Sequence, residues 1–244
     1  METQKNALLP FGTIIALGII LAAGIIGFTF YKIKALENTL SVTGSAKTSV
    51  VSDTVKWNSQ VTRAVGISEL NSGYTQIASD IEKVKKFLID AGVPESEIEI
   101  SSVSFYENYN YGQNISFNNR EYILNQYITV SSKDIEKVTG LSKGVDAIIA
   151  QGVIFQTMSL EYYISNLPEL RVSLLGQAVA DAKARADELA KSSGKKVGTL
   201  KSASSGVVQV LSPNSTEVAD YGSYDTSQID KEVMVTVKAS FTVK

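Results

Sequence analysis

The chain has 244 residues, with 23 Lys and Arg, 25 Asp and Glu, and neither His nor Cys. The missing His excludes Ser-His-Asp and Cys-His catalysis, and the missing Cys excludes thiolate nucleophiles, iron–sulfur clusters and disulfides. The formal net charge of −2 differs from the basic balance of nucleic-acid-binding proteins. Hydrophobic residues make up 44%, so we expect a folded protein. The missing residues and the net charge predict that it is neither a conventional enzyme nor a nucleic-acid-binding protein.

An uncharged apolar segment covers residues 6–31. As a helix it is long enough to cross a hydrocarbon core of about 30 Å. We interpret residues 1–6 as a short tail, 7–31 as a transmembrane signal-anchor and 32–40 as a stalk. The alternative is a cleaved signal peptide with its cleavage site at Ala22-Ala23-Gly24. The apolar residues continue past that site, which favours the uncleaved anchor.

The first part of the remaining chain predicts two strands and a helix. Apolar residues alternate along 42–50 and again along 55–61, with Ser52-Asp53 as a turn between the two strands. From Leu70 to Leu88 the apolar spacing changes to steps of three and four, which predicts a helix. Gly92 is expected to end this helix.

The same succession of strands and helices is predicted downstream. Residues 98–109 and 122–131 are expected to form strands that flank a polar, aromatic hairpin. A second helix follows, with Ser131 and Asp134 at capping-box spacing, and Gly152 ends it. A strand at 153–164 leads to Asn166, the expected N-cap of an Ala-rich third helix that Gly194 ends. Two final strands are expected at about 196–211 and 233–243.

This order of elements, ββαββαβαββ, predicts an α+β fold. Helices would cover one face of a mixed, mostly antiparallel sheet of about seven strands. We interpret residues 41–244 as one domain. Residues 212–230 contain four acidic residues and no Lys or Arg, so we expect a mobile acidic loop there.

Three patterns resemble catalytic or metal sites and have simpler explanations. Ser192 to Lys195 matches the S-x-x-K spacing of acyl enzymes, but Gly194 is better explained as a helix cap. Glu95, Glu97 and Glu99 resemble the paired acids of hydrolases, but Glu97 and Glu99 alternate with Ile98 and Ile100, as on a solvated strand face. The acidic loop lacks the residue order of a Ca²⁺-binding loop. We therefore predict no catalytic, cofactor-binding or metal-binding residues and no bound cofactor.

The strongest candidate for an interaction site is aromatic. Six rings gather in and around the predicted hairpin, and between them lie mainly Asn side chains: Phe105, Tyr106, Tyr109, Tyr111, Phe117 and Tyr122. Stacking on single-stranded nucleic acid needs adjacent basic residues, and Arg120 is the only one in the hairpin. Two interpretations remain open, a locally packed strand pair and a protein–protein interface.

Three pieces of sequence accompany this order of elements. The first is Leu40 to Ala46. The second is Leu88 to Val93 with Ile98 to Tyr109 and Tyr127 to Val130. The third is the helix from Ala178 to Ala190, followed by Gly194 and Val197-Gly198. With these pieces, the layout over about residues 40–243 resembles the SIMPL-domain family of bacterial membrane-anchored or periplasmic proteins. One departure is Val51-Ser52-Asp53, where relatives usually have Pro before the Asp.

The resemblance implies an extracytoplasmic domain, periplasmic or at the cell surface. Counting Lys5 on one side of the anchor against Lys32 and Lys34 on the other slightly favours the opposite orientation, and we let the resemblance decide. It also implies homo-oligomers, with roles linked to envelope integrity and oxidative-stress tolerance, and it brings no catalytic residues. We expect a non-enzymatic, membrane-anchored envelope protein that self-assembles. The alternative is a binding module that presents residues 105–122 and 212–230.

Overall fold

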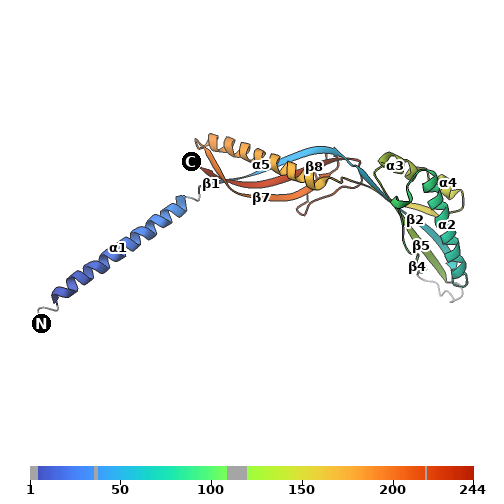
Figure 1. Ribbon diagram of the computed structural model, residues 1–244, viewed down its shortest axis with the longest axis horizontal. Helices are drawn as coiled ribbons and strands as arrows, with labels where there is room; N and C mark the ends of the chain where they lie inside the picture. The colour runs from blue at the N-terminus through green and yellow to red at the C-terminus, as the bar shows by residue number, and fades with distance from the viewer. Residues whose placement is uncertain (1–4, 36–37, 109–119, 218) are drawn as a thin grey trace. The chain divides into compact units, whose positions relative to one another are not determined.

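The computed structural model describes residues 5–35, 38–108, 120–217 and 219–244. Its elements are α1 (Lys5–Ala35), β1 (Thr39–Val51), β2 (Thr54–Gly66), η1 (Ile67–Glu69), α2 (Leu70–Asp90), η2 (Glu95–Glu97), β3 (Ile98–Ile100), β4 (Ser104–Glu107), β5 (Glu121–Ser132), α3 (Ile135–Lys143), α4 (Asp146–Ile149), β6 (Phe155–Tyr163), α5 (Leu167–Ser192), β7 (Val197–Leu211) and β8 (Asp230–Val243) (Figure 1). The predicted α+β class is confirmed.

Helix α1 contains the apolar segment that the sequence predicts to be an anchor. Within Gly12–Lys34, the most apolar 18-residue window has a mean hydropathy of 2.4, and none of this window is buried. A helix of this length and composition is able to cross a membrane. Exposed Ile, Leu and Phe side chains cost little in lipid, whereas in water they would form a large apolar surface.

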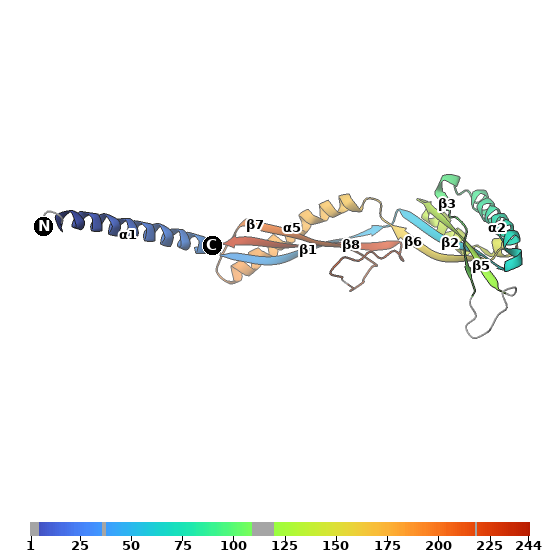
Figure 2. The same ribbon diagram turned by 90° about the horizontal axis from the view of Figure 1, so that it is seen from below.

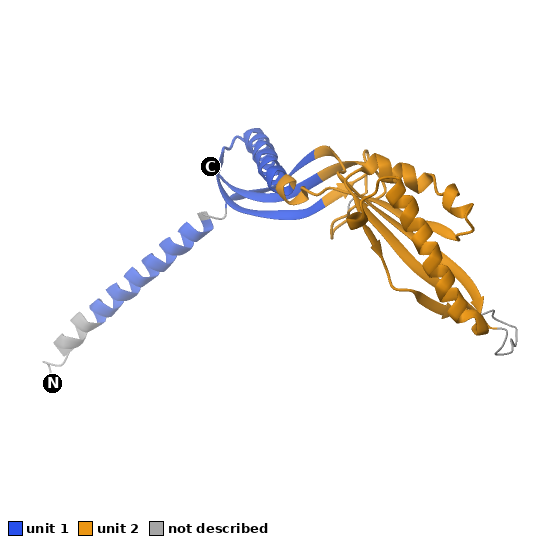
Figure 3. Cartoon of the chain, turned by 45° about the vertical axis from the view of Figure 1, so that its right-hand side comes forward, with its two compact units in different colours: residues 1–47, 171–208, 234–244 blue, residues 48–170, 209–233 orange. Residues whose placement is uncertain are grey.

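The chain forms two compact units, which Figure 3 distinguishes by colour. Unit 1 comprises residues 1–47, 171–208 and 234–244, and unit 2 comprises residues 48–170 and 209–233. The strands lie in two sheets instead of the single sheet that the sequence predicts. One sheet has the order β1-β8-β7, and the other has the order β3-β5-β2-β6 with β4 also paired to β5.

In unit 2, β2 is a central strand. It pairs antiparallel with β5 along its whole length and with β6 on its other side. Alternate β2 side chains are buried on one face, and the side chains of α2, α3 and α4 pack against them. Trp57 is the largest fully buried side chain, and its ring lies 5.9 Å from that of Phe155. This face is the hydrophobic core of the unit, and the helices lie on it as predicted (Figure 2).

Several predicted boundaries are corrected. Strands β1 and β2 do not pair as a hairpin: the Ser52 amide donates to Ile229 O and the Asp53 amide to Tyr163 O, so the chain passes from one sheet to the other. The predicted strand 98–109 is divided into β3 and β4. The second helix is divided into α3 and α4 at Gly144, and Asp134, not Ser131, is its N-cap, because the Asp134 carboxylate accepts the Lys137 amide.

In unit 1, helix α5 packs against the sheet through an alanine stripe. Ala178, Ala182, Ala186 and Ala190 are buried and recur every fourth residue, so they lie on one face of the helix. Their partners include Val42 of β1 with Val237, Ala239 and Phe241 of β8. Small side chains on the helix let its backbone approach the sheet closely, with Phe241 filling the remaining volume.

Gly44 of β1 lies where the helix comes closest. A Cβ atom at this position would overlap the backbone oxygen of Ala178 and the backbone nitrogen of Ala182. Neither contact belongs to a flexible side chain, so the helix itself would have to move. By contrast, a Cβ at Gly140 in α3 would meet nothing within 4 Å.

We predict opposite effects of one methyl group at these two glycines. Gly44→Ala should lower the free energy of unfolding by about 1–3 kcal/mol, as overpacking of a core does. Gly140→Ala should be neutral or raise it by up to about 1 kcal/mol, because Ala favours a helix interior. Urea unfolding of both variants measures the two changes. Equal stability of Gly44→Ala and the unmodified protein would show that α5 does not contact β1 here.

Candidate interaction surfaces and the polar centre of unit 2

The structure brings part of the predicted aromatic cluster together. Phe105 of β4 lies opposite Leu124 of β5, and its ring packs at 6.2 Å from Tyr122 and at 6.5 Å from Tyr74 of α2. Tyr106 pairs with Ile123 and therefore points to the opposite face of the sheet. Tyr109, Tyr111 and Phe117 lie outside the described residues.

Local packing leaves much of these rings in solvent. Phe105 is 53% exposed and Tyr106 is 57% exposed. The aromatic pairs at Phe105 support the packed strand pair, whereas the exposure of Tyr106 leaves a ring available to a partner. The assignment of these residues to a protein–protein interface stays a prediction.

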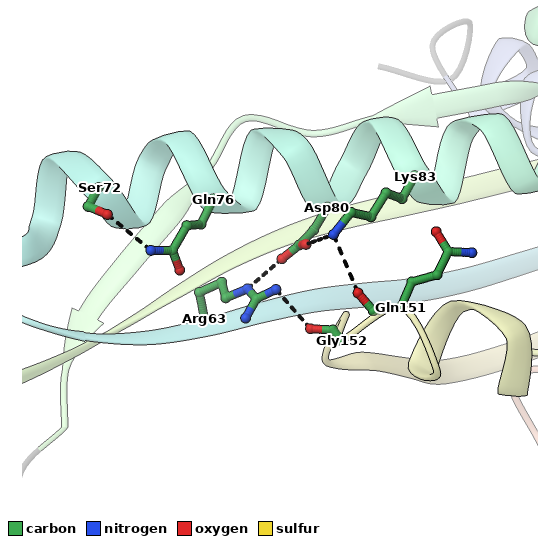
Figure 4. Close-up of polar contacts among 7 residues, drawn as sticks. All are labelled: Arg63, Ser72, Gln76, Asp80, Lys83, Gln151 and Gly152. Carbon is green, nitrogen blue, oxygen red and sulfur yellow. Dashed lines mark hydrogen bonds and ion pairs between the residues drawn. The ribbon is translucent and has the colours of Figure 1, made fainter.

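A buried carboxylate that sequence reasoning missed lies inside α2. Asp80 is 1% exposed, and its carboxylate accepts hydrogen bonds from Arg63 Nε of β2 and, at 3.3 Å, from Lys83 Nζ (Figure 4). The two cations also reach the turn after α4: Arg63 Nη2 donates to Gly152 O at 2.8 Å and Lys83 Nζ to Gln151 O at 3.4 Å. The group joins α2, β2 and this turn.

The electrostatics of this group favour a structural role. The hydrogen bond and charge of Asp80 raise the pKa of Arg63, which already keeps its proton at neutral pH. A carboxylate held by two cations is neither a free nucleophile nor a base. A buried charge needs such partners to offset its loss of hydration.

A second polar network lies on the other face of the same sheet. The Glu161 carboxylate accepts the Tyr163 hydroxyl at 2.6 Å and the Ser159 hydroxyl at 2.8 Å. The hydrogen bond from Tyr163 lowers the pKa of Glu161, and in return the carboxylate raises the pKa of Tyr163 to about 12. Asn58 Nδ2 donates to Ser159 Oγ and joins β2 to the network.

Within unit 2, hydrogen bonds hold residues 224–228 of the acidic segment 212–230. Lys231 is 1% exposed, and its ammonium donates to Asp225 O at 2.5 Å and to Gln228 O at 2.6 Å. Burial lowers the pKa of Lys231. The Tyr162 amide also donates to Thr226 O, and the Ile164 amide to the Tyr224 hydroxyl. The expected mobility of this segment stays a prediction, and these bonds act against it in residues 224–229.

The patterns that resemble catalytic or metal sites in the sequence have ordinary surroundings in the structure. Gly194 has a φ of 70°, and Ser192 Oγ donates to Leu189 O of its own helix, as expected of a helix end. Glu95 pairs with Lys85 at 2.5 Å, and Glu99 is exposed. Within the described ranges, no three acidic side chains come close enough to hold a metal ion.

Asp80 was missed from the sequence alone because a charged side chain on a helix is ordinarily exposed. Asp80 lies between Ile77 and Ile81 on the buried face of α2, and only the packing of α2 against the sheet shows that it is buried. Lys231 was missed because it stands next to an acidic segment, where a solvated lysine is the ordinary expectation.

We predict that Asp80→Asn lowers the free energy of unfolding by about 1–3 kcal/mol, because Arg63 and Lys83 lose their charged partner. Asp90→Asn on the same helix is the matched control. Its carboxylate is 60% exposed and pairs with Lys86, so the change should stay within about 0.5 kcal/mol. Denaturant unfolding compares the two, and equal effects would contradict a stabilising role for Asp80.

The Tyr163–Glu161 bond predicts a defined pH dependence. Its contribution requires an ionised Glu161 and a protonated Tyr163, so it is complete between the ordinary pKa values of 4.5 and 10. It disappears as the pH rises through about 12 or falls through the lowered pKa of Glu161. Tyr163→Phe should therefore cost about 1 kcal/mol at pH 7 and less outside that range. Tyr221→Phe, at a 98% exposed ring, should cost nothing at any pH.

Comparison with known proteins places the chain in a family. A search of curated proteins finds no match. The family model described as "SIMPL: Protein of unknown function (DUF541)" matches residues 40–243, which include both sheets and α5. The resemblance inferred from the sequence is thereby confirmed, and the chain belongs to the SIMPL family.

Proposed function

We propose that this protein is a non-enzymatic, single-pass membrane protein of the cell envelope, whose extracytoplasmic SIMPL domain self-assembles into a homo-oligomer. Its role would be structural or protective against stress, including oxidative stress. Helix α1 supports the anchor, since it is apolar over the length of a membrane and none of its most apolar window is buried. The absence of His and Cys supports a function without nucleophilic catalysis.

The observation that carries self-assembly is the exposure of two aromatic side chains of β4, at the described base of the predicted hairpin. Phe105 and Tyr106 are both more than half exposed on neighbouring positions of β4, a short strand at the side of β5. Tyrosine and phenylalanine bury large areas at little cost in side-chain entropy, and they are enriched in the centres of interfaces. Phe105 packs against Tyr74 of α2, whereas Tyr106 points to the opposite face of the sheet. The same face of a second copy would cover Tyr106, as in symmetric homo-oligomers.

A binding module is the second candidate, and Tyr221 favours it. Its ring is 98% exposed. Four residues further along the chain, the Asp225 carbonyl accepts a hydrogen bond from Lys231. A fixed backbone that presents a free aromatic ring loses little entropy when a ligand binds. In this alternative the protein is a monomer or a small oligomer that presents residues 105–122 and 212–230 to a ligand or partner protein.

Light scattering of the full chain in detergent separates the two candidates. Self-assembly predicts a fixed protein mass, many times that of the chain, over a wide concentration range. The binding module predicts a monomer or a small oligomer. A monomer at every concentration would overturn the self-assembly proposal.

The role of the hairpin is tested by Tyr106→Ser. We expect a lower assembly mass with unchanged far-ultraviolet circular dichroism, because the exposed ring contributes to the interface and little to folding. Tyr221→Ser is the matched control and should leave the mass unchanged. An unchanged mass in Tyr106→Ser would remove the hairpin from the interface.

A further inference from the structure

Strand β7 of unit 1 presents an open edge. It lies at the end of the strand order β1-β8-β7 among the strands that the structure describes. All seven residues from Thr199 to Ser205 are exposed, on both faces of the strand. An edge strand displays backbone N–H and C=O groups that another strand can bind.

The remainder of β7 is covered on this side. Val210 bridges to Tyr224 in parallel, its amide donates to Ser223 O, and its carbonyl accepts the Asp225 amide. Gln209 Nε2 donates to Ala219 O at 2.6 Å. The segment that begins at Ala219 therefore ends the open stretch before Gln209.

The open stretch of β7 has few of the features that usually prevent an edge strand from pairing with another strand. Natural edge strands are short, contain Pro or several charges, or carry a bulge. Strand β7 has 15 residues, contains no Pro, and Lys201 is its one charged side chain. From Ser202 to Gly206 every side chain is small and uncharged, so a second backbone meets no steric barrier.

On β1, at the opposite edge of this sheet, the chain itself binds one backbone donor. The Ser45 amide of β1 donates to the Asp181 carboxylate of α5 at 2.8 Å. Arg185 donates to the same oxygen at 2.8 Å, and the pKa of Asp181 is lowered, first by the Ser45 amide and then by Arg185. Helix α5 thus satisfies one donor of β1 that a partner strand would otherwise use.

We propose that β7 pairs antiparallel with β7 of a second copy of this chain, with Ser202 opposite Ser202. This inference rests on the proposed self-assembly and assigns it a site. An antiparallel pair of identical strands is related by a two-fold axis, so each copy donates and accepts the same hydrogen bonds. The pairing is centred on Ser202, the middle of the exposed stretch. It places Lys201 opposite Ala203 and avoids two lysines directly opposite each other.

The chain contains no Cys, so one introduced thiol reports on this geometry without interference. In the proposed register the two copies of residue 202 have Cα atoms about 4.5–5.5 Å apart, within the range of a disulfide. The two copies of residue 204 are four positions out of register, about 13 Å apart, beyond that range. Ser204→Cys is therefore a matched control on the same strand.

The experiment oxidises Ser202→Cys and Ser204→Cys, each in the full chain in detergent, and follows the cross-linked dimer on non-reducing gels. We expect Cys at 202 to cross-link at least about tenfold faster than Cys at 204, because adjacent thiols have a high effective concentration. Circular dichroism of the reduced variants confirms that both are folded.

The outcomes distinguish this inference from the proposed function. An oligomeric mass by light scattering with equal cross-linking rates at both positions would overturn the β7 pairing and leave self-assembly standing. The same mass with faster linkage at 204 would also overturn the register. A monomeric mass with no cross-linking would overturn both the pairing and the proposed self-assembly.

Discussion

The structure of unit 2 depends on the burial of one face of β2. Val55, Trp57 and Val61 point from alternate positions into the same core, where each is at most 1% exposed. Because side chains alternate along a strand, a shift of one residue in either pairing would move this face into solvent. The apolar face thus fixes the register with β5 and β6 together, and the three helices of the unit pack on the surface that results.

Unit 1 forms its hydrophobic core with different side chains. Unit 2 fills its core with Trp57 and branched aliphatic residues, whereas four of the five buried residues of α5 are alanines and the fifth is Leu174. Backbone proximity replaces side-chain volume, and Gly44 is the position at which even a methyl group has no room. In each unit a carboxylate on the helix also binds a strand. Asp181 of α5 accepts the Ser45 amide of β1 in unit 1, and Asp80 of α2 binds Arg63 of β2 in unit 2.

The surfaces proposed for self-assembly are the parts that this internal packing leaves uncovered. The rings of Phe105 and Tyr106 are outside the main core of unit 2, and the exposed stretch of β7 is outside the core that contains the α5 alanine stripe. Both are backbone or aromatic surfaces with few charges. Such surfaces suit an oligomer of identical chains better than recognition of a charged ligand.

The sequence by itself determined the apolar helix at the N-terminus, the α+β class, the long helices α2 and α5, and the ends of three helices at Gly92, Gly152 and Gly194, each with a positive φ. These features depend on hydrophobic periodicity and on local backbone preferences, which neighbouring residues specify. The family was accessible for the same reason, since its segments follow these elements in order.

Only the tertiary structure decided how the strands divide between two sheets and which polar residues are buried. Ser52-Asp53 has the composition of a hairpin turn, yet its amides bond to Ile229 and Tyr163, which lie far away in the sequence. Asp80 and Lys231 have ordinary surface chemistry and become buried only because α2 and the segment 219–230 pack where they do. Hydrogen bonding and desolvation depend on contacts between residues that are far apart in the sequence, and the spacing of residues along the chain does not predict those contacts.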